Sequence, residues 1–168
     1  MLSTKIVVHS LLSTEDLLAI CELKYSAWPY SMEKQKQWIK ENIKRNDSHL
    51  LLFENDELVA YMNLVQIKVF VNSIVLEAYG IGNVCSKEKA KGYGGLLMNE
   101  IGKYLTDKKA VGLLFCKNYL IEFYLKYSWF LIDKSKIDMV FEITIDFNMM
   151  CYNLNPNFNT LEYKDRIF

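Results

Sequence analysis

The chain has 168 residues, and its 20 lysines and arginines balance its 20 aspartates and glutamates, so the formal net charge is zero. This length suits one domain, and the charge balance lacks the positive surplus of a protein that grips nucleic acid. Hydrophobic residues make up 51%, which permits a full core and argues against disorder. The sequence has neither an apolar run long enough to span a bilayer nor a secretory signal, so we expect no membrane partner.

The predicted elements begin with a strand over residues 4–9, which is rich in β-branched side chains. Ser13 is expected to cap a helix, because a capping hydroxyl is followed there by acidic residues in the first turn. Trp28-Pro29-Tyr30 ends this helix, since proline disfavours helix in the residue before it. A second helix is predicted over about residues 32–45.

Two strand-like runs follow, at residues 49–54 and 57–65, and Asn55-Asp56 between them is a hairpin signal. The second run extends to about residue 71, and Asn72-Ser73 turns the chain into a third strand near residues 74–85. The rest of the pattern predicts a helix at 93–106, a buried strand at 111–116, a helix at 118–127, and strands at 129–133 and 137–146.

The element order β-α-α-β-β-β-α-β-α-β-β predicts a single mixed α/β domain over residues 1–146. Residues 147–168 are polar and rich in asparagine, and they are predicted to form a tail whose role the sequence does not tell.

Cysteine and histidine are sparse and scattered. The residues are Cys21, Cys85, Cys116, Cys151, His9 and His49. They form none of the clusters that bind zinc, and a chain of this length builds a core without a disulfide framework. We therefore expect no metal, and thiols kept reduced in the cytoplasm.

Five of the seven glycines lie close together in the chain, namely Gly80, Gly82, Gly92, Gly94 and Gly95. A predicted strand there runs into a loop with Lys89 and Lys91, and the loop runs into a helix. Glycines let backbone N–H groups turn inward, and a helix N-terminus adds a positive dipole end, so this order is typical of phosphate binding. The segment matches neither the GxxxxGK[ST] loop nor the spacing of the dinucleotide fingerprint GxGxxG.

The predicted strand itself is unusually rich in small residues. By the period-two rule Ala78, Gly80, Gly82 and Val84 share one face. Glycine inside a strand often marks the close approach of a ligand or another backbone. An extended ligand that lies along this strand and ends in phosphates explains both the strand and the loop, whereas a turn crowded only for packing explains the loop alone.

Two motifs in this part of the chain resemble the Gcn5-related N-acetyltransferase (GNAT) superfamily. Its signature [Q/R]-x-x-G-x-[G/A] corresponds to Lys89-Ala90-Lys91-Gly92-Tyr93-Gly94, with lysine in place of glutamine or arginine. The family's asparagine and FYxKxGF motif correspond to Asn118 and to Phe123-Tyr124-Leu125-Lys126-Tyr127-Ser128-Trp129, with Ser128 in place of glycine. The resemblance implies the GNAT fold, a twisted and mostly antiparallel sheet of about seven strands flanked by about four helices.

The resemblance also implies an activity, the transfer of an acetyl group from acetyl-CoA to a primary amine in a ternary complex. The implied cofactor-binding residues are Gly82, Asn83, Val84, Lys89, Ala90, Lys91, Gly92, Tyr93, Gly94, Gly95 and Asn118. The strand residues among them pair with the pantetheine amides, the loop holds the pyrophosphate, and a strand N–H polarises the thioester carbonyl.

The reaction needs a base for the amine and an acid for the departing thiolate. Tyr124 matches the family position of the acid, although its aromatic neighbours also fit ordinary packing. Glu77 falls one residue from the position of a carboxylate base, and a water chain to solvent is an equal alternative. Trp28, Tyr30 and Ser31 are candidates for the acceptor site, with a core anchor as the alternative for Trp28.

The sequence leaves open whether the acceptor is a small-molecule amine or a peptide. It also leaves open whether the protein forms a homodimer. Two other functions compete with amine acetylation: a non-catalytic acyl-CoA-binding regulatory domain, and acetylation of a protein lysine or N-terminus. The departures at Lys89 and Ser128 keep the regulatory domain as an alternative.

Overall fold

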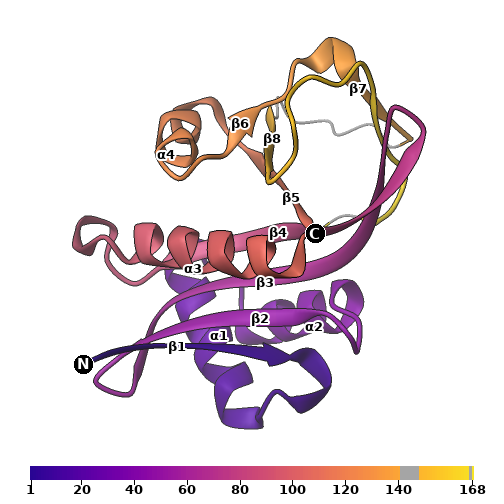
Figure 1. Cartoon of the computed structure of the whole chain (residues 1–168). Coiled ribbons are helices and arrows are strands. Elements are labelled where there is room, and N and C mark those ends of the chain that lie inside the picture. The colour runs from indigo at the N-terminus through magenta and orange to yellow at the C-terminus, as the bar shows by residue number, and fades with distance from the viewer. Residues whose placement is uncertain (141–147, 167) are drawn as a thin grey trace. The chain divides into compact units, whose positions relative to one another are not determined.

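The computed structural model describes residues 1–140, 148–166 and 168, in which the chain forms nine strands and four α-helices. The strands are β1 (Leu2–Val8), β2 (Ser48–Glu54), β3 (Glu57–Val71), β4 (Ile74–Ser86), β5 (Val111–Cys116), β6 (Phe130–Leu131), β7 (Ile137–Met139), β8 (Asn148–Tyr152) and β9 (Leu161–Tyr163). The α-helices are α1 (Thr14–Ala27), α2 (Met32–Asn42), α3 (Tyr93–Lys108) and α4 (Ile121–Leu125). The predicted mixed α/β class and the element order as far as β7 are confirmed (Figure 1).

The local signals act as the sequence predicts. The Ser13 hydroxyl caps α1 by accepting a hydrogen bond from the Asp16 N–H at 3.0 Å. Asn55 and Asp56 between β2 and β3 both have positive φ, and so do Asn72 and Ser73 between β3 and β4. Two successive residues with positive φ are what a tight two-residue hairpin turn requires.

The helix predicted over residues 118–127 is shorter and begins as a 3-10 turn. This turn spans Asn118–Leu120, and α4 follows it. The Ser128 N–H donates to the Leu125 carbonyl at 3.2 Å, and the Trp129 N–H donates to the Tyr124 carbonyl at 3.4 Å. These two bonds form a Schellman cap, in which Ser128 adopts the left-handed conformation with φ of 64°. The serine therefore takes the backbone conformation that glycine takes in the family motif.

The predicted tail contains two strands. β8 pairs antiparallel with both β5 and β6, and β9 pairs parallel with β7 and antiparallel with the end of β3. β8 begins with asparagine, which is depleted in strands, and β9 has only three residues, so both segments owe their conformation mainly to the strands they pair with and to burial. Of the predicted strand 137–146, Ile137–Met139 is confirmed as β7, and residues 141–147 lie outside the described residues.

The chain divides into two compact units. Unit 1 comprises Met1–Val65, Gly82–Glu100 and Phe168, and unit 2 comprises Gln66–Ile81 and the described residues of 101–167. Strands β3 and β4 and helix α3 each pass from one unit into the other along the chain.

In unit 1, β2 lies between β1 and β3 and pairs antiparallel with both. Helices α1 and α2 lie together on one side of these strands (Figure 1). Leu50, Leu51 and Leu52 of β2 are all buried, which requires that both faces of the strand are covered. Leu52 lines a small hollow together with Leu96 of α3, so the first half of α3 covers the other face.

In unit 2, β4 pairs in parallel with β5, and β5 pairs antiparallel with β8. Trp129, Leu113 and Cys151 are buried in its core.

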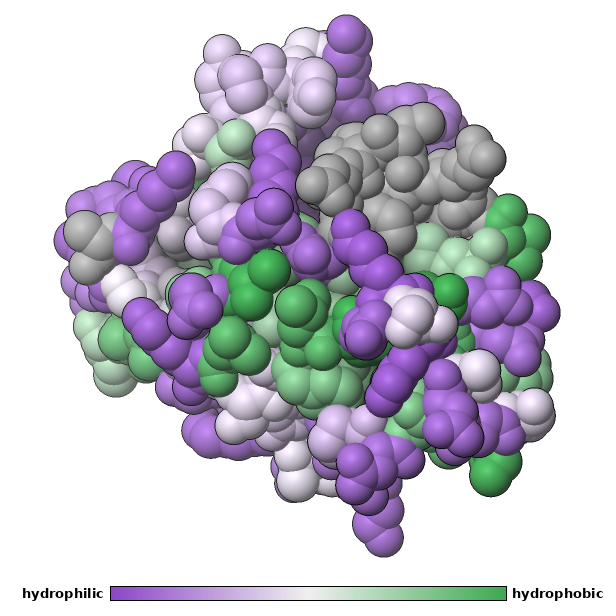
Figure 2. Space-filling view, turned by 90° about the horizontal axis from the view of Figure 1, so that it is seen from above, coloured by the Kyte–Doolittle hydropathy of each residue, from purple (hydrophilic) through white to green (hydrophobic). Residues whose placement is uncertain are grey.

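Figure 2 looks at the molecule from above and shows apolar surface interspersed with hydrophilic side chains. Within the described residues no helix is both long and apolar enough to cross a membrane.

A chain of polar side chains is buried inside unit 1. The His49 Nε2 atom lies 2.9 Å from Nδ1 of His9, and its Nδ1 atom lies 2.9 Å from the Tyr61 hydroxyl. His49 is fully buried, and burial lowers its pKa to about 4, helped by the neighbouring His9 and opposed by Asp47. The folded protein therefore keeps this imidazole neutral.

Acidification is predicted to destabilise the protein through His49. An unfolded histidine binds a proton near pH 6.5, whereas the folded one does so only near pH 4. The unfolded state thus binds more protons in this window, and the free energy of unfolding falls by about 3 kcal/mol across the whole window and by about 2 kcal/mol between about pH 7 and about pH 5. Urea unfolding at about pH 7 and about pH 5 measures this fall. His49→Gln should flatten the pH dependence, and an unchanged dependence in that variant would contradict the prediction.

Candidate functional site

The small-residue strand is interrupted at Asn83. β4 pairs with β5 over Ala78–Ile81, and Gly82, Asn83 and Val84 follow that stretch directly. Asn83 has φ of 52°, which is left-handed backbone inside a strand. Such a residue breaks the period-two alternation of side chains. The expectation that Val84 shares a face with the glycines before it is therefore wrong.

The Asn83 side chain is held from β3, because its Nδ2 atom donates to Oδ1 of Asn63 at 2.6 Å. Asn63 also lies beside Gly82. A Cβ atom at position 82 would come within 3.0 Å of Asn63 Nδ2 and within 2.6 Å of the backbone carbonyl carbon of Phe168. Only glycine leaves room for such a close approach of two groups.

The loop after β4 ends in the conformation expected of a phosphate-binding turn. Lys89–Lys91 form a 3-10 turn, and Gly92 follows in the left-handed region with φ of 76°. α3 begins at Tyr93, and the first N–H groups of a helix have no partner within it. Those N–H groups and the positive end of the helix dipole are suited to an anion.

Two of the three lysines around this loop are already paired with carboxylates. Lys87 forms an ion pair with Glu57, and Lys91 Nζ lies 2.9 Å from Glu88. Lys89 is exposed. The loop is therefore less basic than its sequence alone indicates. The backbone N–H groups are correspondingly more important as donors to an anion.

The Tyr93 side chain anchors the start of α3. Its ring is buried, and its hydroxyl donates to Glu54 of β2 at 2.7 Å. This hydrogen bond to Glu54 raises the pKa of the phenol. The helix N-terminus is thereby fixed to the C-terminal end of β2, and the buried Tyr93 side chain leaves only the backbone of this residue to contact a ligand.

The three residues expected at the acceptor site also belong to unit 1. Trp28 closes the end of α1 and is 37% exposed, so it is not a buried core anchor. Tyr30 is exposed, and the Ser31 hydroxyl caps α2 by accepting from the Lys34 N–H at 3.3 Å. Trp28 and Tyr30 thus offer accessible aromatic surface, whereas Ser31 has a structural partner.

Unit 2 contains the other three predicted site residues. Asn118 is exposed, and its Oδ1 atom accepts from Asn148 Nδ2 at 2.6 Å. Tyr124 is buried, with its ring centroid 5.1 Å from that of Phe123, and burial raises its pKa. This phenol therefore carries its proton at neutral pH.

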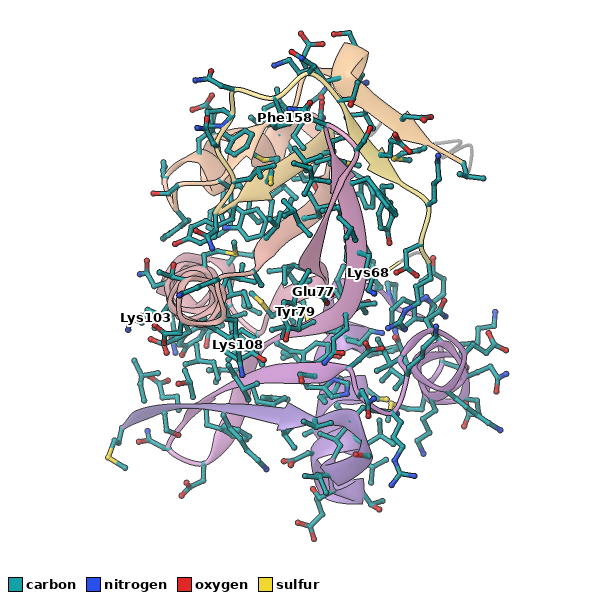
Figure 3. The ribbon with its side chains drawn as sticks, turned by 45° about the vertical axis from the view of Figure 1, so that its right-hand side comes forward. Lys68, Glu77, Tyr79, Lys103, Lys108 and Phe158 are labelled. Carbon is teal, nitrogen blue, oxygen red and sulfur yellow. The ribbon has the colours of Figure 1, made fainter. Side chains whose placement is uncertain are left out.

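Glu77 lies in unit 2 on a well-exposed part of β4. Its side chain is 79% exposed, and a carboxylate oxygen lies 4.0 Å from Lys68 Nζ of β3 (Figure 3). An ion pair this exposed contributes little to stability. The carboxylate is thus in contact with solvent rather than enclosed in a site.

Several buried polar residues of unit 1 are not predicted from the sequence, and two of them, Lys24 and Asn63, lie inside its apolar core. Lys24 is 2% exposed, with Nζ lying 4.2 Å from the centre of a Trp38 ring, and burial lowers its pKa to about 8. The sequence feature that indicates its burial is its position three residues after Cys21, on the apolar side of α1. Asn63 is fully buried, and the sequence feature that indicates this is its amide side chain within the apolar run ELVAYMNLV.

The chain has a mixed α/β fold in which a strand runs through a glycine-rich loop into a helix, and such a helix N-terminus is suited to an anion. The family model described as the acetyltransferase (GNAT) domain matches residues 10–132. The chain therefore belongs to the GNAT acetyltransferase family, and the predicted membership is confirmed.

Solved structures agree with this fold. Escherichia coli ElaA superposes with a TM-score of 0.65 at 22% identity, covering 90% of this chain and 99% of that one. An acyl-CoA N-acyltransferase from Pseudomonas aeruginosa has a TM-score of 0.66 at 17% identity, with coverage of 90% and 99%. The catalytic domain of Tetrahymena Gcn5 histone acetyltransferase in complex with coenzyme A has a TM-score of 0.61 at 15% identity, with coverage of 92% and 94%. No curated protein sequence matches the chain.

Gly92→Ala is predicted to lower the free energy of unfolding by about 1–2 kcal/mol, because an alanine in the left-handed region pays that backbone cost. A Cβ at this position meets no atom within 4 Å, so the loss comes from the backbone alone. Gly92→Asn is the matched control and should lose less, since asparagine visits this region more readily. Urea unfolding of the three proteins measures the difference, and equal losses in both variants would contradict it.

Proposed function

We propose that the protein is an N-acetyltransferase that moves the acetyl group of acetyl-CoA to a primary amine by direct attack in a ternary complex. The observation that carries the proposal is the course of residues 82–95 within unit 1. A strand interrupted at Asn83 leads into a loop that ends on left-handed Gly92, and the first turn of α3 follows. Family membership supports the same reading.

This segment fits the two halves of acetyl-CoA. Gly82, Asn83 and Val84 pair with the pantetheine amides as an added strand pairs with a sheet edge. The N–H groups at Gly94 and Gly95 bind the pyrophosphate at the start of α3, with further charge from Lys89. Asn118, in unit 2, is proposed as a cofactor contact from its position in the family motif alone. The missing Cβ at Gly82 lets neighbouring groups approach the strand backbone closely, as the Asn63 amide and the Phe168 carbonyl do in the structure.

The transfer itself exchanges one bond for another. The lone pair of the unprotonated amine forms a C–N bond with the thioester carbon, and the carbonyl π pair moves onto oxygen. When that pair returns, the C–S bond breaks and coenzyme A leaves as a thiolate. The nitrogen loses one proton and the sulfur gains one, so an acid and a base are needed.

Tyr124 is the proposed acid. Its raised pKa keeps the phenol protonated at neutral pH, and it matches the family position for this role. For the amine proton, the 79% exposure of Glu77 favours water leading to solvent over this carboxylate as the acceptor.

The acceptor is an amine carried by a small molecule or a peptide. The accessible aromatic surface of Trp28 and Tyr30 is suited to contact it. A solved relative is the Escherichia coli N-acetyltransferase for an alanine of ribosomal protein S18, which keeps a protein acceptor among the candidates.

The alternative of a non-catalytic acyl-CoA-binding domain loses one of its two supports. Ser128 replaces the glycine of the family motif, yet it takes the left-handed conformation with a complete Schellman cap. The backbone at the end of α4 therefore has the conformation that a glycine would give it. Of the two differences from the family motifs, only the lysine at position 89 still supports the alternative.

Acetyl-CoA is predicted to stabilise the fold and to be consumed. At about 100 times its dissociation constant it raises the free energy of unfolding by roughly 2.7 kcal/mol, because it binds only the folded state. Thermal unfolding with and without acetyl-CoA measures this effect.

A thiol-release screen against polyamines, aminoglycosides, amino acids and peptides then identifies the acceptor. Absence of any thermal shift would overturn the assignment of the cofactor, and binding without turnover of any acceptor would favour the regulatory domain.

Tyr124→Phe is predicted to lower kcat by about 100-fold or more, since a positioned general acid contributes at least that factor. Its affinity for acetyl-CoA should stay close to that of the wild type, because the ring is retained. The matched control is Tyr127→Phe, which removes a hydroxyl from another ring packed on Phe123, 5.2 Å between centroids. Steady-state kinetics and titration with acetyl-CoA compare the variants, and wild-type kcat in Tyr124→Phe would remove this residue from the mechanism.

A further inference from the structure

One amide group of unit 1 is buried with half of its hydrogen-bonding capacity unused. Asn63 of β3 is 0% exposed, and its Oδ1 atom accepts from Asn83 Nδ2 at 2.6 Å. Its own Nδ2 atom has no hydrogen-bond partner among the described residues. A buried donor left in this state costs about 1–3 kcal/mol. Such a cost inside a well-packed strand points to a partner that binds from outside the chain.

The unused donor is directed at the space beside Gly82. Its nitrogen lies 3.0 Å from the position that a Cβ of residue 82 would take. The carbonyl carbon and oxygen of Phe168 lie 2.6 Å and 3.1 Å from that same position. The space therefore accommodates a planar carbonyl group against the strand, and any side chain at residue 82 would fill it.

The orientation of the Asn63 amide is fixed by its neighbour. Asn83 has left-handed backbone, and its side chain donates to the oxygen of Asn63, so the nitrogen of Asn63 must face the other way. A donor that is already oriented before a ligand arrives needs no reorganisation during a reaction. This is the arrangement expected for a group that stabilises developing negative charge.

We propose that Asn63 donates a hydrogen bond from Nδ2 to the acyl carbonyl oxygen of acetyl-CoA, and that this bond strengthens as the oxygen becomes negative. The inference rests on the proposed function and adds a side-chain donor to the backbone N–H groups of β4. When the amine attacks, the carbonyl π pair moves onto this oxygen, and it returns as the C–S bond breaks. The acyl group takes the space in which the Phe168 carbonyl lies, so binding displaces Phe168.

The test uses the full chain and acetyl-CoA labelled with ¹³C at the thioester carbonyl. In the wild type, the infrared band of the bound carbonyl should lie at lower frequency than in solution, because a hydrogen bond weakens the C=O bond. Asn63→Leu keeps the volume and removes the donor, so the band should return toward its solution position. With the acceptor identified by the thiol-release screen, kcat should fall by about 100-fold or more, the loss typical of an oxyanion donor.

Tyr61→Phe is the matched control. Tyr61 lies two residues before Asn63 on the same face of β3 and is equally buried, and the variant loses the hydrogen bond to His49. It should lower stability and leave both the carbonyl band and kcat at wild-type values. If Asn63→Leu does not fold, Asn63→Ala, which also removes the donor, replaces it with the same two measurements.

The outcomes separate this inference from the proposed function. If wild type and variant both bind acetyl-CoA and have the same carbonyl band, Asn63 is not the donor, while acetyl-CoA binding stands. If Tyr61→Phe moves the band as much as the Asn63 variant, the effect is structural and the inference is overturned. If the wild type binds no acetyl-CoA, the proposed function fails and the inference falls with it.

Discussion

The left-handed backbone at Asn83, held by the side-chain bond to Asn63, is the constraint on which the candidate site depends. A regular strand would continue its alternation of side chains and offer its N–H groups to a neighbouring strand. The break at Asn83 ends that regularity directly before the loop that leads to α3. Gly82 precedes the break, and its missing Cβ lets Asn63 and Phe168 approach the strand closely. One irregular residue thus ends the regular strand at the point where the proposed function places the ligand.

Unit 1 buries several polar side chains, and three of them differ in the hydrogen-bond or ring partners that they have. His49 has a partner on each ring nitrogen, so its burial is satisfied within the fold. Lys24 has an aromatic ring beneath its ammonium group, which compensates part of its desolvation. Asn63 alone among these three keeps a donor without a partner in the described part of the chain. A buried donor without a partner departs from the rule that buried polar groups are hydrogen-bonded, and such departures are expected at functional sites.

Much of the fold could be predicted because its signals are local. The serine cap of α1, the hairpin at Asn55-Asp56 and the apolar run of β5 each depend on a few adjacent residues. β8 and β9 could not be predicted, because such short segments carry little local signal and become strands only when other strands are available to pair with them. For the site, the glycine cluster and the two motifs led to the cofactor segment, whereas Asn63 carried only the weak signal of an amide among apolar residues.

The sequence by itself determined the order of the elements, the turns, the glycine-rich loop and membership of the family, since these follow from spacing over short stretches of chain. The tertiary structure alone decided which charges are neutralised, as for Lys87 beside Glu57, and which are exposed, as for Glu77. It also decided that the nitrogen of Asn63 faces Gly82. The physical reason is that hydrogen-bond partners, burial and electrostatic neighbours come from residues distant in the chain, and only folding brings them within bonding distance.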